Sequence, residues 1–132
     1  MRVLAVDFGE KRIGLAVSDP LGFSAQGLET IQHQNKRQTF QKLAGVCREF
    51  RVDEIVIGLP VNMNGTHGPK AKEVLEWMSE MGTVLNLPVK AWDERLTSRA
   101  AGRVMIEAGL SRRKQKEKSD RLAAVLILQS YL

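Results

Sequence analysis

Two apolar, strand-like segments at the start of the chain are separated by only a short polar turn, and this spacing most constrains the fold. Residues 2–8 form the first segment and residues 12–18 the second, with Glu10-Lys11 between them. A connection this short joins antiparallel strands, because parallel strands need a crossover of a dozen or more residues. A weaker strand pattern over residues 24–31 follows another turn. We therefore predict an antiparallel meander of three strands.

The rest of the chain alternates between helical and strand-like periods. Apolar residues at helical spacing predict helices over about residues 35–51, 69–81 and 101–108. A last helix is predicted from Asp120 to the C-terminus, with Ser119 as its cap. Short apolar runs predict strands at residues 54–59 and within residues 83–92. Strand–helix–strand alternation requires right-handed crossovers and parallel strands. The expected fold is α/β, with a mixed five-stranded sheet and helices on both faces, in one domain spanning residues 1–132.

Length and composition exclude several classes of protein. A chain of 132 residues with 43% apolar content fits a single globular domain. No apolar run approaches the roughly 18 residues of a membrane span. The apolar segment after Arg2 is short and broken by Asp7, which argues against a signal peptide. The single Cys47 excludes an internal disulfide and a cysteine-based zinc cluster. We expect a cytoplasmic protein with no membrane partner.

The net charge of +5 is concentrated near the C-terminus. Residues 1–90 carry 11 basic and 10 acidic side chains, whereas residues 91–132 carry 9 basic and 5 acidic ones. Much of the excess falls within residues 110–118, which we predict to be a basic loop. Such a segment can follow a phosphate backbone, and a solvated surface loop is the competing explanation. Its basic residues are Arg112, Arg113, Lys114, Lys116 and Lys118.

Three carboxylates occupy positions that predict a shared site. Asp7 ends an apolar, β-prone run, where an unpaired charge is costly to bury. Glu94 follows the last predicted strand, and Asp120 begins the last predicted helix, whose positive end favours the ionised form. In open α/β sheets, sites form beyond the carboxyl ends of the strands. The small residues Ala123 and Ala124 share the helix face of Asp120 and permit a close approach to the sheet.

Carboxylates grouped in this way favour divalent metal chemistry. They repel one another unless a cation intervenes, and their hard oxygens prefer Mg²⁺ or Mn²⁺. One or two such ions stabilise the oxygens of a phosphoryl displacement, and a basic rim would hold a nucleic-acid backbone. Two alternatives stay open at this point. Asp7 can be a structural acid paired with Arg12, and Asp93 competes with Glu94, because neighbouring strand residues face opposite sides of a sheet.

Four spaced segments of the chain resemble one known family over nearly the whole sequence. They are Val6-Asp7-Phe8-Gly9 with Arg12-Ile13-Gly14, Gly58-Leu59-Pro60 with Gly65, Asp93-Glu94-Arg95-Leu96-Thr97-Ser98, and Ser119-Asp120 with Ala123-Ala124. In this order they resemble the YqgF/RuvX family of Holliday junction resolvases and nucleases that mature the small-subunit ribosomal RNA precursor. That family belongs to the ribonuclease H-like fold.

The resemblance implies catalytic, metal-binding roles for Asp7, Glu94 and Asp120. No acid or histidine follows Asp120, so three ligands are expected. Arg12 and Arg95 flank two of the acids, and each is predicted either to contact phosphates or to neutralise the carboxylates. His33 and His67 lie in polar surroundings and are predicted to be surface residues.

Three classes of function remain to be compared. The first is a metal-dependent nuclease that processes the 5′ end of precursor 16S rRNA or resolves Holliday junctions. The second is a catalytically silent nucleic-acid-binding module of the same fold. The third is an ATP-handling domain of the actin and sugar-kinase type, which needs two such domains where 132 residues supply one. The three acids favour the nuclease. RNA and branched DNA both remain possible partners, for a monomer or a homodimer.

Overall fold

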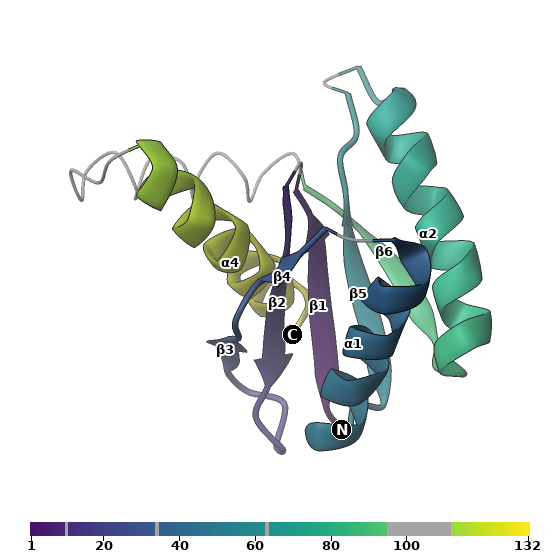
Figure 1. The fold of residues 1–132 in the computed structure, drawn as a ribbon. Helices are drawn as coiled ribbons and strands as arrows, with labels where there is room; N and C mark the ends of the chain where they lie inside the picture. The colour runs from purple at the N-terminus through teal and green to yellow at the C-terminus, as the bar shows by residue number, and fades with distance from the viewer. Residues whose placement is uncertain (10, 34, 63, 95–111) are drawn as a thin grey trace.

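The computed structural model describes the chain except for residues 10, 34, 63 and 95–111, and of residues 112–120 it describes only the backbone. Figure 1 shows a central sheet with helices on both sides. The strands are β1 (Val3–Phe8), β2 (Arg12–Ser18), β3 (Ala25–Gly27), β4 (Ile31–Gln32), β5 (Glu54–Leu59) and β6 (Val89–Asp93). The helices are α1 (Lys36–Glu49), α2 (Pro69–Leu85) and α4 (Arg112–Tyr131). The predicted helix over residues 101–108 lies outside the described residues.

The sheet is mixed, as the sequence predicts. Its strand order is β3-β2-β1-β5-β6, with β4 also paired to β2. Strands β1, β2 and β3 pair antiparallel in a meander, and β1, β5 and β6 run parallel. The carboxyl ends of the three parallel strands therefore meet at one edge of the sheet. This edge is where the sequence places Asp7 and Glu94.

Alternation along the strands divides the core into two layers. On one face, Leu4, Val6 and Phe8 of β1 pack with residues of α1 and α2. On the other face, Val3 and Ala5 pack with residues of α4. Aromatic contacts tie α2 to the first layer, since the ring of Trp77 lies 5.1 Å from that of Phe8 and 5.3 Å from that of Phe40. Asp7, which lies between Val6 and Phe8, belongs to the face that α4 covers.

The third predicted strand is divided in two, so the sheet has six strands where five were expected. β3 pairs with the end of β2, and β4 pairs with its beginning, at Arg12 and Ile13. Between them, Leu28 still donates a backbone hydrogen bond to the Leu15 carbonyl at 2.9 Å. The ladder therefore breaks only after Leu28, and the meander itself is confirmed.

Two helix boundaries differ from the prediction. α2 continues to Leu85 and ends where Asn86 adopts the left-handed conformation, a common helix stop. The last helix begins at Arg112, not at Asp120, so the predicted basic loop is helical over residues 112–118 and Ser119 does not cap a helix start. Lys, Arg, Gln and Glu are good helix formers, so this polar segment needs no apolar face to extend the helix. None of the helices in the described ranges is long and apolar enough to cross a membrane.

Candidate carboxylate site

Asp7 is a buried acid on the face of the sheet that α4 covers. It is the fifth residue of β1 and pairs with Gly14 of β2. Only 7% of its surface is exposed, among the least exposed acids of the described chain. Burial of a carboxylate is costly unless a partner compensates the charge. The position of Asp7 therefore requires a partner, and among the described side chains an acidic neighbour comes from the end of another strand.

That neighbour is Glu94, which continues the line of β6. Its backbone N–H donates to the Leu59 carbonyl at 3.1 Å, and this bond extends the β5–β6 ladder by one residue. The Glu94 carboxyl group reaches Asp7 and forms a side-chain hydrogen bond with it. Between the competing acids 93 and 94, the structure therefore brings Glu94 to Asp7. Asp93 precedes it in the strand and pairs with Leu59.

Gly58 leaves the space through which the Glu94 side chain reaches Asp7. A Cβ atom at position 58 would lie 2.8 Å from both Cγ and Cδ of Glu94 and 2.5 Å from Cδ1 of Ile127 in α4. Real Cβ contacts are almost never so short, so the Glu94 side chain crosses β5 over the bare glycine backbone. The sequence motif Gly58-Leu59-Pro60 contains this residue, but the pattern alone does not reveal what fills the space above it.

The pairing strongly perturbs the ionisation of Asp7. Burial raises the pKa of Asp7 well above its ordinary value, and the hydrogen bond and charge of Glu94 raise that pKa further. The positive charge of Lys70 acts in the opposite direction and lowers the Asp7 pKa. A hydrogen bond between two carboxyl groups requires that one of them carries a proton. The two carboxyl groups therefore make this bond only while one of them is protonated.

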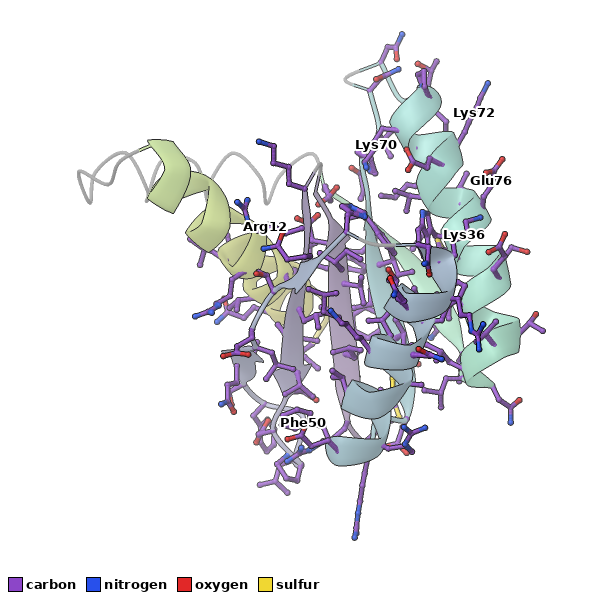
Figure 2. All side chains as sticks on the ribbon, viewed as in Figure 1. Arg12, Lys36, Phe50, Lys70, Lys72 and Glu76 are labelled. Carbon is purple, nitrogen blue, oxygen red and sulfur yellow. The ribbon has the colours of Figure 1, made fainter. Side chains whose placement is uncertain are left out.

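Lys70 is a site residue that sequence reasoning missed. It lies in the first turn of α2, directly after Pro69, where the chain returns from the carboxyl end of β5. Figure 2 shows it at the top of α2, beside the loop that leaves β5. Its Nζ atom lies 4.0 Å from the Glu73 carboxylate. Its place at the start of the helix that follows the β5 loop is a signal that the sequence contains, since sites in parallel sheets form beyond the carboxyl ends of the strands.

The backbone of Asp120 lies within α4, ahead of the residues of this helix that pack against the sheet. The buried residues Ala123, Ala124, Ile127 and Leu128 follow it at intervals typical of one helix face. Ala124 is fully buried against Val3, Ala5 and other small residues of the sheet, so α4 approaches closely, as predicted. The backbone of Asp120 lies one turn before Ala124, while its side chain is outside the described part of the structure.

The predicted phosphate contacts have different surroundings. Arg12, the first residue of β2, is only 9% exposed, and Figure 2 shows it on the upper part of the sheet near α4. Arg95 lies outside the described residues. Arg112, Arg113, Lys114, Lys116 and Lys118 belong to the first turns of α4, whose side chains are not described. Of the histidines, His67 is exposed as predicted, whereas His33 is half-buried.

The donor chemistry of the Asp7–Glu94 pair fits a divalent cation. A hard cation can replace the shared proton and compensate both carboxylates, and oxygen ligands select Mg²⁺ or Mn²⁺. Among the side chains that the structure describes, no group of three His, Cys, Asp or Glu residues is close enough to hold a metal. Asp120, the third predicted ligand, is not among those side chains.

Comparisons with known proteins identify the family. A protein from Syntrophomonas wolfei named "Putative pre-16S rRNA nuclease" is 51% identical over 132 residues, covering 100% of this chain and 94% of that one. A protein of the same name from Clostridium kluyveri is 49% identical over the same length. These relatives match the chain from end to end.

Solved structures match the fold at low sequence identity. RuvC from T. thermophilus in complex with a Holliday junction has a TM-score of 0.58 at 19% identity, over 96% of this chain and 91% of that one. The fowlpox virus resolvase in complex with Holliday junction DNA has a TM-score of 0.60 at 13% identity, over 99% and 96%. These likenesses confirm a ribonuclease H-like fold. The family model RuvX, described as Holliday junction resolvase, matches residues 1–132, and the chain belongs to this family.

Proposed function

We propose that this protein is a divalent-metal-dependent nuclease that hydrolyses phosphodiester bonds in nucleic acid. The observation that carries the proposal is the buried Asp7–Glu94 carboxyl pair at the carboxyl edge of the sheet. Asp7, Glu94 and Asp120 would hold one or two Mg²⁺ or Mn²⁺ ions. When bound, such ions activate water and stabilise charge on the oxygens of a phosphoryl displacement.

The protein's own residues prepare this chemistry in distinct ways. β1 holds Asp7 in a buried position, and Gly58 leaves the space in which Glu94 reaches it. A bound cation would take the place of the proton between the two acids, and oxygens of both acids would then be available as ligands. Lys70 on one side and the basic first turns of α4 on the other supply positive charge for the phosphate backbone. A catalytically silent binding module has no need for the buried acid pair.

Precursor 16S rRNA is the proposed first substrate. The relatives at 49–51% identity carry that substrate in their names, and they match the full length of this chain. The resolvase structures are below 20% identical, so they support the fold and a nucleic-acid partner in general. Junction resolution also needs two paired cuts and hence a two-fold dimer, whereas processing of an RNA end needs one cut at a time.

The decisive experiment compares wild type with Asp7→Asn. Purified protein with Mg²⁺ or Mn²⁺ is incubated with a precursor 16S rRNA 5′ end and, in parallel, with a four-way DNA junction. We expect the wild type to cleave the RNA and the variant to cleave neither substrate. Binding by the variant should be equal or tighter, because a repelling charge is lost. Equal cleavage by both proteins would refute the nuclease proposal, and binding without cleavage by the wild type would favour the silent module.

A second pair of variants separates the neighbouring acids. Glu94→Gln removes the carboxylate that meets Asp7 and should abolish cleavage. Asp93→Asn makes the same chemical change one residue earlier and should keep cleavage within a few-fold of wild type. Initial rates at saturating metal distinguish the two. A larger loss in the Asp93 variant would transfer the ligand role to that residue.

A further inference from the structure

His33 is bonded to the turn that follows Asp7. It comes directly after β4, which pairs with Arg12 and Ile13 at the beginning of β2. Its backbone N–H donates to the Lys11 carbonyl at 3.0 Å. Its ring Nε2 lies 2.7 Å from the Gly9 carbonyl oxygen. One residue therefore contacts both arms of the β1–β2 turn.

The ring contact fixes the protonation of one nitrogen. A carbonyl oxygen only accepts hydrogen bonds, so Nε2 of His33 must carry a hydrogen and donate it. The 2.7 Å distance is short for a nitrogen donor, and the ring is half-buried. The ring therefore carries a hydrogen on Nε2 in either of its possible forms, the neutral tautomer or the cation. In both forms the ring restrains the Gly9 carbonyl.

The restrained turn joins the two strands that carry Asp7 and Arg12. Gly9 lies two positions after Asp7, and its own N–H donates to the Arg12 carbonyl at 2.9 Å. Movement of the Gly9 peptide would therefore be transmitted to Asp7 on one strand and to Arg12 on the other. Ligand carboxylates must be held to within about 0.5 Å of the productive geometry, and neighbouring hydrogen bonds do much of this work.

We propose that His33 is a positioning residue of the carboxylate site, whose Nε2–H···O bond to Gly9 restrains the turn after β1 and so holds Asp7 in the geometry that binds metal. The inference rests on the proposed nuclease function. It adds a residue outside the carboxylate set, from a different part of the meander. The matched control is His67, which is exposed in the loop after β5 and has no part in this contact.

Three variants test the proposal: His33→Ala removes the donor, His33→Gln offers an amide N–H at a similar reach, and His67→Ala removes the other histidine. We expect His33→Ala to weaken Mn²⁺ binding and lower kcat by about 10–100-fold, with KM for nucleic acid changed less than about twofold. His33→Gln should recover most of both losses, and His67→Ala should match the wild type. Mn²⁺ binding is measured by calorimetry.

Amide hydrogen exchange at Gly9 gives a readout that needs neither metal nor substrate. We expect faster exchange in His33→Ala than in His67→Ala or His33→Gln, because the turn opens more often without the ring. Normal exchange and metal binding in His33→Ala would overturn the proposal, as would a His33→Gln protein as impaired as His33→Ala. If the wild type cleaves no nucleic acid, the nuclease proposal fails, while the exchange and binding comparison still decides the role of His33.

Discussion

Gly58 supports the site because it has no side chain and so leaves space for Glu94. We expect Gly58→Ala to displace both Glu94 and Ile127, since the new Cβ would lie within 2.8 Å of each. Overpacking of this kind costs about 1–3 kcal/mol of stability. Loss of Glu94 from its place should also reduce cleavage about 10–100-fold, in line with other residues that support metal ligands. Urea unfolding and initial cleavage rates measure the two effects.

Gly45 provides the matched control for Gly58→Ala. It lies within α1, and a Cβ atom there meets nothing within 4 Å. Gly45→Ala should therefore stabilise the protein by about 0.5–1 kcal/mol, because glycine inside a helix costs conformational entropy. Cleavage should be unaffected. If Gly58→Ala behaved like Gly45→Ala in both measurements, the space above Gly58 would have no role in placing Glu94.

The raised pKa of Asp7 predicts how stability depends on pH. In the unfolded chain Asp7 ionises near pH 4, whereas in the folded protein its pKa lies well above the ordinary value. As pH rises from about 4 through that folded pKa, the unfolded state binds fewer protons than the native state, so stability falls. Asp7→Asn removes this loss. Without divalent metal, the variant should be more stable than wild type at pH 7, by a margin that shrinks towards pH 4.

Thermal unfolding between pH 4 and 8 measures this margin. Mg²⁺ or Mn²⁺ should raise the midpoint of the wild type by binding the native state, and should raise that of Asp7→Asn much less. Parallel pH profiles for the two proteins would mean that Asp7 titrates normally. The Asp7–Glu94 contact was predictable because Asp7 lies near the end of β1 and Glu94 follows β6, and these two strands end at one edge. The roles of Gly58 and His33 were not predictable, because they depend on contacts with segments far away in the sequence.

At the scale of elements, α4 is tied to the sheet at its C-terminal end by a polar cluster. The Tyr131 hydroxyl donates to the buried Glu54 carboxylate, and Lys90 Nζ lies 3.5 Å from the same carboxylate. The Tyr131 ring also packs edge-on against Trp92, with ring centroids 5.6 Å apart. This cluster lies at the amino end of β5, opposite the carboxylate site. It fixes one end of the helix whose other half carries Asp120.

Tyr131→Phe tests this anchor. The change keeps the ring against Trp92 and removes only the hydroxyl, so Glu54 loses a donor in a buried position. A loss of about 1–2 kcal/mol in the free energy of unfolding is expected. Lys90→Ala is the comparison, and because Lys90 is 58% exposed it should cost less than about 1 kcal/mol. Urea unfolding gives both values, and a larger loss in Lys90→Ala than in Tyr131→Phe would mean that Lys90, not Tyr131, stabilises the cluster.

The sequence patterns predicted some helix and strand boundaries closely and missed others. Apolar periodicity predicted α1 and β5 closely, because each buries a continuous face. It placed the start of α4 eight residues too late, since the residues from Arg112 onward have no apolar stripe to detect. The end of α2 was missed for the opposite reason, as Thr83 and Val84 are β-prone but still lie within the helix.

In the whole molecule, one face of the sheet carries the larger core and the other carries the carboxylate site. α1 and α2 cover the face with the larger core, while α4 shares the other face with Asp7. The basic first turns of α4 extend beyond the residues that pack on the sheet, as Figure 1 shows. The uneven charge of the sequence left two explanations for this segment, a nucleic-acid surface or a solvated loop. Because the segment is helical, Ala substitutions should leave its backbone intact, which makes the surface suitable for a charge test.

Replacing Arg112, Arg113 and Lys114 together with Ala should weaken nucleic-acid binding for every sequence tested. If each contacts one phosphate, the slope of log K against log salt should flatten by about 0.7–0.9 for each residue lost. The control removes three exposed charges from α1, on the opposite face, with Arg37, Lys42 and Arg48 changed to Ala. Both variants have the same net charge, so a general electrostatic effect would change both slopes alike. If nucleic acid binds along α4, the slope of log K against log salt should flatten in the α4 variant and stay unchanged in the α1 variant.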